Sequence, residues 1–85
     1  MLITSPEKAE KLYDKIAAEL EKQYGSPDEQ TDDRKPQDNG KTLDWHEKDW
    51  IASGPDGETK LWIARWQLDG DKNASISFGV ICPQG

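Results

Sequence analysis

Residue types that carry chemistry are scarce in this chain of 85 residues. One cysteine (Cys82) and one histidine (His46) exclude an intrachain disulfide, a cysteine metal cluster and a histidine-pair metal site. A glycine-rich phosphate loop is also missing. His46 and Glu47 begin like a zinc-protease helix motif, but Trp50 stands where the second histidine would be. These absences predict a protein that is not an enzyme and that needs no metal or cofactor.

Two other patterns begin like a functional site without completing it. A Cys82–His46 dyad needs two separate strands to bring the side chains together, and the parity of Cys82 favours a buried structural thiol. Residues 69–73 place oxygen ligands at alternate positions, like the start of a calcium loop. However, Ala74 stands where such a loop has glycine, and Val80 stands where it has a bidentate glutamate. A hairpin turn is therefore the better interpretation of this segment.

Long apolar stretches are missing as well. No segment approaches the ~18 apolar residues that cross a bilayer, and residues 1–5 are too short for a signal peptide, which favours a cytoplasmic protein without a membrane partner. Hydrophobic residues make up 33% of the chain and charged residues 33%, so the sequence predicts a single domain, 1–85, with a thin core. The formal net charge of −6 disfavours nucleic acid as a direct partner, because nucleic acid is itself a polyanion.

Residues 5–24 have the pattern of one amphipathic helix. Ser5 is a suitable N-cap, Pro6 suits the first helical position, and Gly25 suits the helix end. Apolar residues recur at three- and four-residue steps and form one stripe: Ala9, Leu12, Tyr13, Ile16, Ala17, Leu20 and Tyr24. The opposite face mixes acids and bases, so we interpret it as solvated.

The segment 25–41 has no large apolar side chain between Ser26 and Lys41. Its Pro, Gly, Asp, Gln and Asn content is typical of exposed chain that cannot bury apolar surface. We therefore predict a mobile loop over residues 25–41.

A three-stranded sheet is predicted over residues 42–82. The run 61–68 has large apolar residues on both parities and lies between two turns, so it is the expected central strand. Residues 42–53 precede it through the turn 54–57, and residues 74–82 follow it through a second hairpin. The predicted fold is therefore α+β, with one N-terminal helix packed on a three-stranded antiparallel meander.

The parity of the side chains sets which face of this sheet the helix covers. Trp45 and Trp50 have opposite parities, so we expect a β-bulge or a break within 46–49 that brings both to one face. The covered face is predicted to carry Trp62, Trp66, Ile76, Phe78 and Val80. The other face, of mixed polarity, would carry Leu61, Ile63, Arg65, Ser75, Ser77 and Ile81.

Negative charge is concentrated in residues 42–59, which hold five acids against Lys48 alone. In the predicted meander this strand lies at an edge, where charge protects a sheet from aggregation. Charge around tryptophan is also typical of binding surfaces. The candidate partner-binding residues are Asp44, Trp45, Glu47, Asp49, Trp50, Asp56 and Glu58.

The leading hypothesis from the sequence is a non-enzymatic protein-binding module. It would act as a small acidic inhibitor or neutraliser of a partner with a basic site, and its composition would also suit a mimic of nucleic-acid charge. Two alternatives stay open. The outer faces or the edges of two sheets could pair into a homodimer, or a tryptophan platform could bind a ligand such as a carbohydrate.

Overall fold

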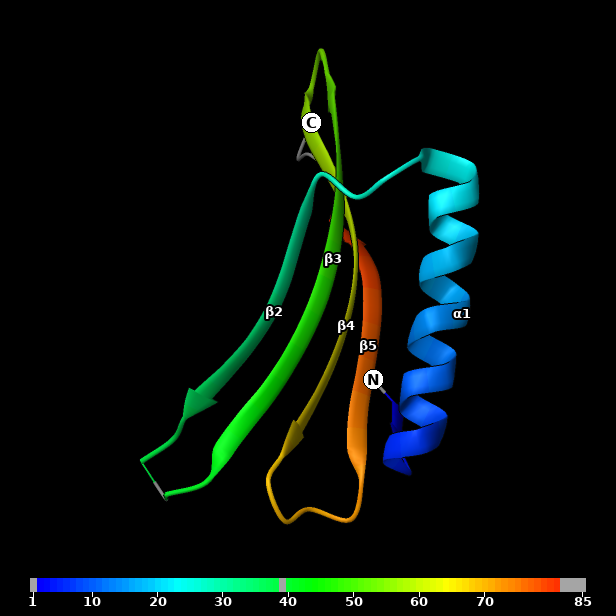
Figure 1. Ribbon diagram of the computed structural model, residues 1–85. Coiled ribbons are helices and arrows are strands. Elements are labelled where there is room, and N and C mark those ends of the chain that lie inside the picture. The colour runs from blue at the N-terminus through cyan, green and yellow to red at the C-terminus, as the bar shows by residue number, and fades with distance from the viewer. Residues whose placement is uncertain (1, 39, 82–85) are drawn as a thin grey trace.

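The computed structural model describes residues 2–38 and 40–81 and contains one helix and one five-stranded antiparallel sheet (Figure 1). The elements in chain order are β1 (Leu2–Thr4), α1 (Pro6–Tyr24), β2 (Glu29–Pro36), β3 (Thr42–Gly54), β4 (Gly57–Leu68) and β5 (Ala74–Ile81). The strand order across the sheet is β1-β5-β4-β3-β2. The predicted α+β class, with an N-terminal helix on an antiparallel sheet, is confirmed. The three-stranded meander is a coarser count, because β1 and β2 extend the sheet at its two edges.

The helix begins and ends where its sequence indicates. The Ser5 hydroxyl accepts a hydrogen bond from the Lys8 amide at 3.4 Å. Gly25 ends the helix with φ at 85°, a backbone conformation that favours glycine, and its amide donates to the Glu21 carbonyl at 2.8 Å. The predicted helix over residues 5–24 is therefore confirmed.

The strands β3 and β4 form one long hairpin with continuous pairing. The register runs without a gap from the second residue of β3 to the turn between Gly54 and Gly57. The β-bulge or break expected within 46–49 is therefore wrong. Because side chains alternate along an uninterrupted strand, Trp45 and Trp50 point to opposite faces of the sheet.

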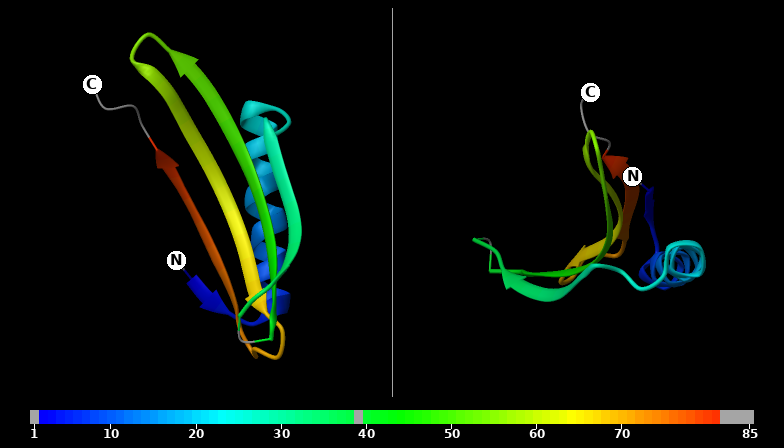
Figure 2. Two further views of the ribbon diagram at one scale, coloured as in Figure 1. Left: turned by 90° about the vertical axis from the view of Figure 1, so that its left-hand side faces the viewer. Right: turned by 90° about the horizontal axis from the view of Figure 1, so that it is seen from above.

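The core lies between α1 and one face of the sheet. Seen along the helix axis, α1 covers that face only (Figure 2). The buried cluster consists of Tyr13, Ala17, Trp50, Ile63 and Ile76, with Leu12, Ile16, Leu20 and Leu61 packed against it. The apolar stripe of the helix is thus the face that packs, although Tyr24 at its end stays exposed.

The parity predicted for the central strand is wrong. Ile63 is fully buried under α1, with Leu61 and Arg65 on the same side, whereas Trp62 and Trp66 face away from the helix. The cause is space. On the face away from the helix, Ala64 is small and Gly79 leaves the space that the Trp62 ring occupies.

The strand β5 has the predicted parity but only part of the predicted burial. Ile76 lies in the core, as expected. Phe78 and Val80 lie on the same face of the sheet, but they are 66% and 56% exposed. Their expected burial is therefore wrong.

Within the segment predicted as a mobile loop, residues 29–36 form the strand β2, so the loop prediction is wrong there. β2 pairs with β3 along its whole length. It needs no core side chain, because backbone pairing and polar contacts hold it. The Ile51 amide donates to Asp28 Oδ2 at 2.6 Å, and the Arg34 guanidinium donates to Asp69 Oδ1 at 3.2 Å. Consequently β3 is not an edge strand, although its charges suggested one. The charged strand β2 forms that edge of the sheet.

Two further expectations depend on which residues the structure describes. Within 2–38 and 40–81, no helix is both long enough and apolar enough to cross a membrane. Cys82, expected to be a buried structural thiol, lies outside the described residues.

Ile63→Ala should lower the free energy of unfolding by about 2–5 kcal/mol, because it leaves a cavity at a fully buried position under α1. Ile3→Ala is the matched control. Ile3 is 59% exposed on β1, so its truncation should cost less than about 0.5 kcal/mol. Urea denaturation followed by circular dichroism measures both values. Equal losses for the two variants would contradict this assignment of the core.

Candidate functional site

The sheet face opposite α1, here called the open face, carries three tryptophans. Trp45 comes from β3, and Trp62 and Trp66 come from β4. Trp45 and Trp66 are direct cross-strand partners whose rings stack with centroids 5.0 Å apart and planes at 20°. In the described part of the chain no helix covers this face (Figure 2), and each of the three side chains is only partly buried.

Small residues explain why the rings lie against the sheet. Ala64, between Trp62 and Trp66 along β4, is 1% exposed although it belongs to the open face. A Cβ added to Gly79 of β5 would lie 3.1 Å from the Trp62 ring, so the glycine leaves the space that the indole occupies. The three indoles, with Ala64 beneath them, form the floor of a depression of about 320 Å³.

Two carboxylates of β3 lie on the open face beside the rings. Glu47 accepts a hydrogen bond from the Trp45 indole at 3.2 Å. Asp49, the next residue of β3 on this face, is 2% exposed, and the Lys60 ammonium lies 3.7 Å from its Oδ1, beyond hydrogen-bond distance. Burial raises the pKa of Asp49 to about 6; the neighbouring Glu47 carboxylate adds to the rise, and the Lys60 charge opposes it. Asp49 therefore keeps its proton in mildly acidic solution, where a free aspartate is ionised.

Other charges extend across the open face. By register it also carries Glu29, Asp33 and Glu58 as acids, and Lys35 as a base. The Lys35 ammonium lies 3.7 Å from Asp33 Oδ2; the lysine side chain is largely exposed and the aspartate side chain partly so. Over the described strands, acids outnumber bases five to two on this face, so the surroundings of the tryptophans are acidic.

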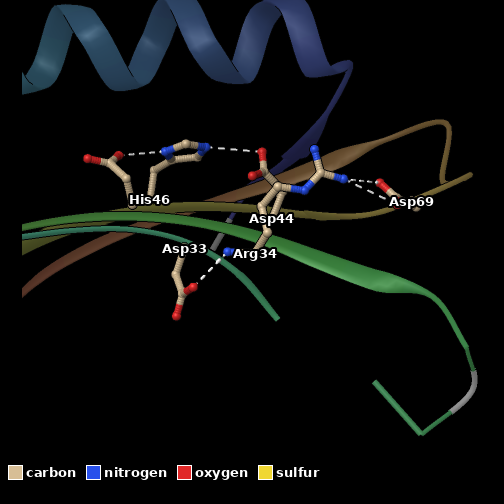
Figure 3. Close-up of polar contacts among 6 residues, drawn as sticks. Asp33, Arg34, Asp44, His46 and Asp69 are labelled. Atoms are coloured by element: carbon tan, nitrogen blue, oxygen red, sulfur yellow. Dashed lines mark hydrogen bonds and ion pairs between the residues drawn. The ribbon is translucent and has the colours of Figure 1, made fainter. Parts of the chain in front are cut away.

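A second polar cluster surrounds His46 on the helix side of β2 and β3. The ring Nδ1 lies 2.7 Å from Asp32 Oδ1, and Nε2 lies 3.0 Å from Asp44 Oδ2, so each ring nitrogen has a carboxylate oxygen at hydrogen-bond distance. Figure 3 shows the Arg34 guanidinium turned toward Asp69 on the same side, with Asp33 on the other side of the sheet. These charges satisfy one another, so we interpret the cluster as a structural link between strands.

The structure separates the seven residues predicted to bind a partner. Trp45, Glu47 and Asp49 lie together on the open face. Asp44 and Trp50 lie on the helix side, where Trp50 is buried in the core. Glu58, at the start of β4, belongs to the open face by register, and Asp56 lies in the turn of the β3–β4 hairpin. The acidic segment 42–59 therefore contributes to three separate places, namely the open face, the helix side of the sheet and the hairpin turn.

Sequence reasoning missed Trp62 and Trp66 as members of the open face. The signal that identifies them lies on the neighbouring strand. Trp62 pairs with Gly79 and Trp66 with Ser75, so each large ring stands opposite a small residue of β5. A strand that alternates small and large residues indicates which face has room for rings.

Comparison with known proteins adds no assignment to this geometry. No family model, curated protein or solved structure matches the chain. The function is therefore argued from the open face itself.

Asp49→Asn should raise the free energy of unfolding at pH 7 by roughly 1–3 kcal/mol, because an amide carries no buried charge. A carboxyl whose pKa rises on folding stabilises the fold below about pH 4 and loses that contribution as the pH rises to about 6. The gain in the free energy of unfolding that Asp49→Asn brings should therefore grow from about pH 4 to about pH 6 and stay constant at higher pH. Urea denaturation at a series of pH values measures it.

The control for Asp49→Asn is Glu58→Gln, which removes a carboxylate at an exposed position and should show no such growth. An Asp49→Asn variant that is less stable than wild type at pH 7 would mean that attraction to Lys60 outweighs the cost of burial.

Asp32→Asn should lower the free energy of unfolding at pH 7 by less than about 1 kcal/mol, since the side chain is largely exposed to solvent. Hydrogen bonds from His46 and Gln30 hold the pKa of Asp32 below its usual value. Its stabilisation is therefore present at neutral pH and lost as the pH falls through the folded-state value. In strong acid the variant and wild type should therefore have the same free energy of unfolding. Asp38→Asn, at an exposed position of the β2–β3 connection, is the control and should show no difference at any pH.

Proposed function

We propose that this protein is a non-enzymatic protein-binding module whose open face holds a basic surface of another protein. The observation that carries the proposal is the uncovered group of Trp45, Trp62 and Trp66. Partly exposed indoles in one patch are typical of anchor residues at protein interfaces. The strands already position the rings, so a partner that covers them gains contact area with little further ordering.

The charges around the rings support a basic partner. A lysine or arginine side chain that reaches Trp45 would meet an aromatic face and the carboxylates of Glu47 and Asp33 together. The acidic excess of the open face would also attract such a partner at a distance and speed its association. The same excess disfavours nucleic acid and anionic membrane as partners.

An inhibitor or neutraliser is the role that this geometry suits best, because a small acidic domain can cover a basic site and block access to it. The proposal includes a cytoplasmic location. A single cysteine in the whole chain fits a reducing compartment.

A ring-shaped ligand such as a carbohydrate is the second candidate. The observation in its favour is the depression of about 320 Å³, which has indole rings on its floor and Glu47 and Lys60 at its sides. That volume lies at the lower end of the range of small-ligand sites, about 300–1,000 Å³.

The test is binding kinetics with a basic protein that the immobilised wild-type chain captures from a lysate of the source organism. Glu47→Lys should slow association several-fold and weaken its dependence on salt, because exposed charges steer encounter. Trp62→Ala should speed dissociation about tenfold or more, as loss of an anchoring ring does. Association and dissociation rates at two salt concentrations separate the two effects.

Glu10→Lys is the matched control for Glu47→Lys. It makes the same change of charge on the exposed side of α1, so it should bind like wild type. Association of Glu47→Lys at the wild-type rate at both salt concentrations would contradict an acidic binding surface. Loss of binding to a glycan array in Trp62→Ala, with protein capture unchanged, would favour the carbohydrate candidate instead.

A further inference from the structure

Exposed apolar side chains gather at one edge of the sheet. Of the six exposed large hydrophobic residues in the described chain, five lie on β1 and β5: Leu2, Ile3, Phe78, Val80 and Ile81. β1 and β5 are the last two strands on that side of the sheet. This concentration is what distinguishes the edge, since single exposed apolar residues are common on any protein.

Half of β5 has an open outer side. β1 pairs only with residues 74–76 of β5, and among the described residues no strand pairs with the outer side of 77–81. Figure 2 shows the short β1 beside one end of β5, and the other end free. The backbone donors and acceptors on that side can accept another strand of about five residues.

The opposite edge of the sheet is protected from such pairing. β2 contains Glu29, Asp32, Asp33, Arg34 and Lys35, and it ends at Pro36. β5 contains no charged residue and no proline. Charge and proline at an edge oppose pairing with another chain, so β5 is the edge that the chain leaves open to a partner strand.

An apolar depression adjoins this edge on the helix side. It has a volume of about 280 Å³, and its lining includes Tyr24, Trp50, Leu61 and Val80. A strand added beside β5 would bring one of its side chains next to Val80 at the mouth of this depression. An aromatic residue at that position would fill it, as anchor residues fill pockets at interfaces.

We propose that the occupant is a second copy of this chain, with the open segments of the two copies, residues 77–81, side by side and antiparallel about a two-fold axis at Gly79. Antiparallel pairing of a strand with itself is self-complementary, as a two-fold interface requires. The register about this axis pairs Gly79 with Gly79 and Phe78 with Val80 of the second copy, and it stops short of Ser77 because Leu2 already lies opposite Ile76. Each Phe78 then reaches the depression beside the other copy's Val80. The result is a continuous ten-stranded sheet.

The absence of charge on β5 is the reason to prefer a second copy over a basic partner at this edge. Each chain has a formal net charge of −6, so two copies avoid repulsion best where neither carries charge. A basic partner would gain nothing there from complementary charge. Three paired residues bury less area than a standard interface of about 800 Å² per partner, so the dimer should be weak, with a Kd in the micromolar range or above.

Sedimentation velocity from 5 μM to 1 mM tests the proposal, with circular dichroism to confirm that each variant is folded. Wild type should shift from monomer to dimer over this range. Phe78→Lys should raise the Kd at least tenfold, because it places a charge in an apolar interface. Combining Phe78→Lys with Val80→Glu should restore dimerisation, because the new lysine of one copy then faces the new glutamate of the other twice across the axis.

Ile3→Lys is the control, since it adds the same charge to the same apolar edge but outside residues 77–81. It should dimerise like wild type. Three results would each overturn the proposal: a wild type that stays monomeric at 1 mM, a Phe78→Lys variant that dimerises like wild type, or an Ile3→Lys variant that dissociates as much as Phe78→Lys.

Discussion

The uninterrupted ladder between β3 and β4 is the constraint on which the rest of the structure depends. A slip of one residue would exchange the two faces of one strand relative to the other. In the observed register Trp50 and Ile63 reach α1, while Trp45 and Trp66 stack on the other side. The Trp50 indole also donates to the Gly25 carbonyl at 2.9 Å, so the same register ties the end of the helix to the sheet. One register therefore decides both which side chains form the core and which lie on the open face.

Sequence reasoning recovered the elements whose signals are local, namely α1 with its cap residues and the three strands joined by hairpin turns. It missed β2, because a strand is normally recognised by apolar alternation and β2 has none. What makes β2 a strand is its partner: Asp32 stands opposite His46, and Arg34 stands opposite Asp44. Such complementarity belongs to two strands in register, so it becomes visible only when the register is known. The three residues of β1 are too few to show any period.

For the candidate site, sequence reasoning found Trp45 and the acids of β3 but assigned the tryptophans of β4 to the covered core. Hydrophobicity alone favours burial of every large ring. The deciding quantity was space, because Ala64 and Gly79 leave room for the rings on the open face. Matching of side-chain size between elements far apart in the sequence thus sets the parity of β4. No pattern within β4 itself contains that information.

The two proposals share one geometric consequence. A two-fold axis that pairs β5 with its copy stands perpendicular to the sheet, because antiparallel pairing preserves the face on which each side chain lies. Both open faces then lie on one side of the ten-stranded sheet, and both helices lie on the other. A partner with two basic sites would meet both faces at once, and the second contact would gain from a high effective concentration. The pairing of 77–81 can therefore be weak in isolation, because a bivalent partner stabilises the paired form by mass action.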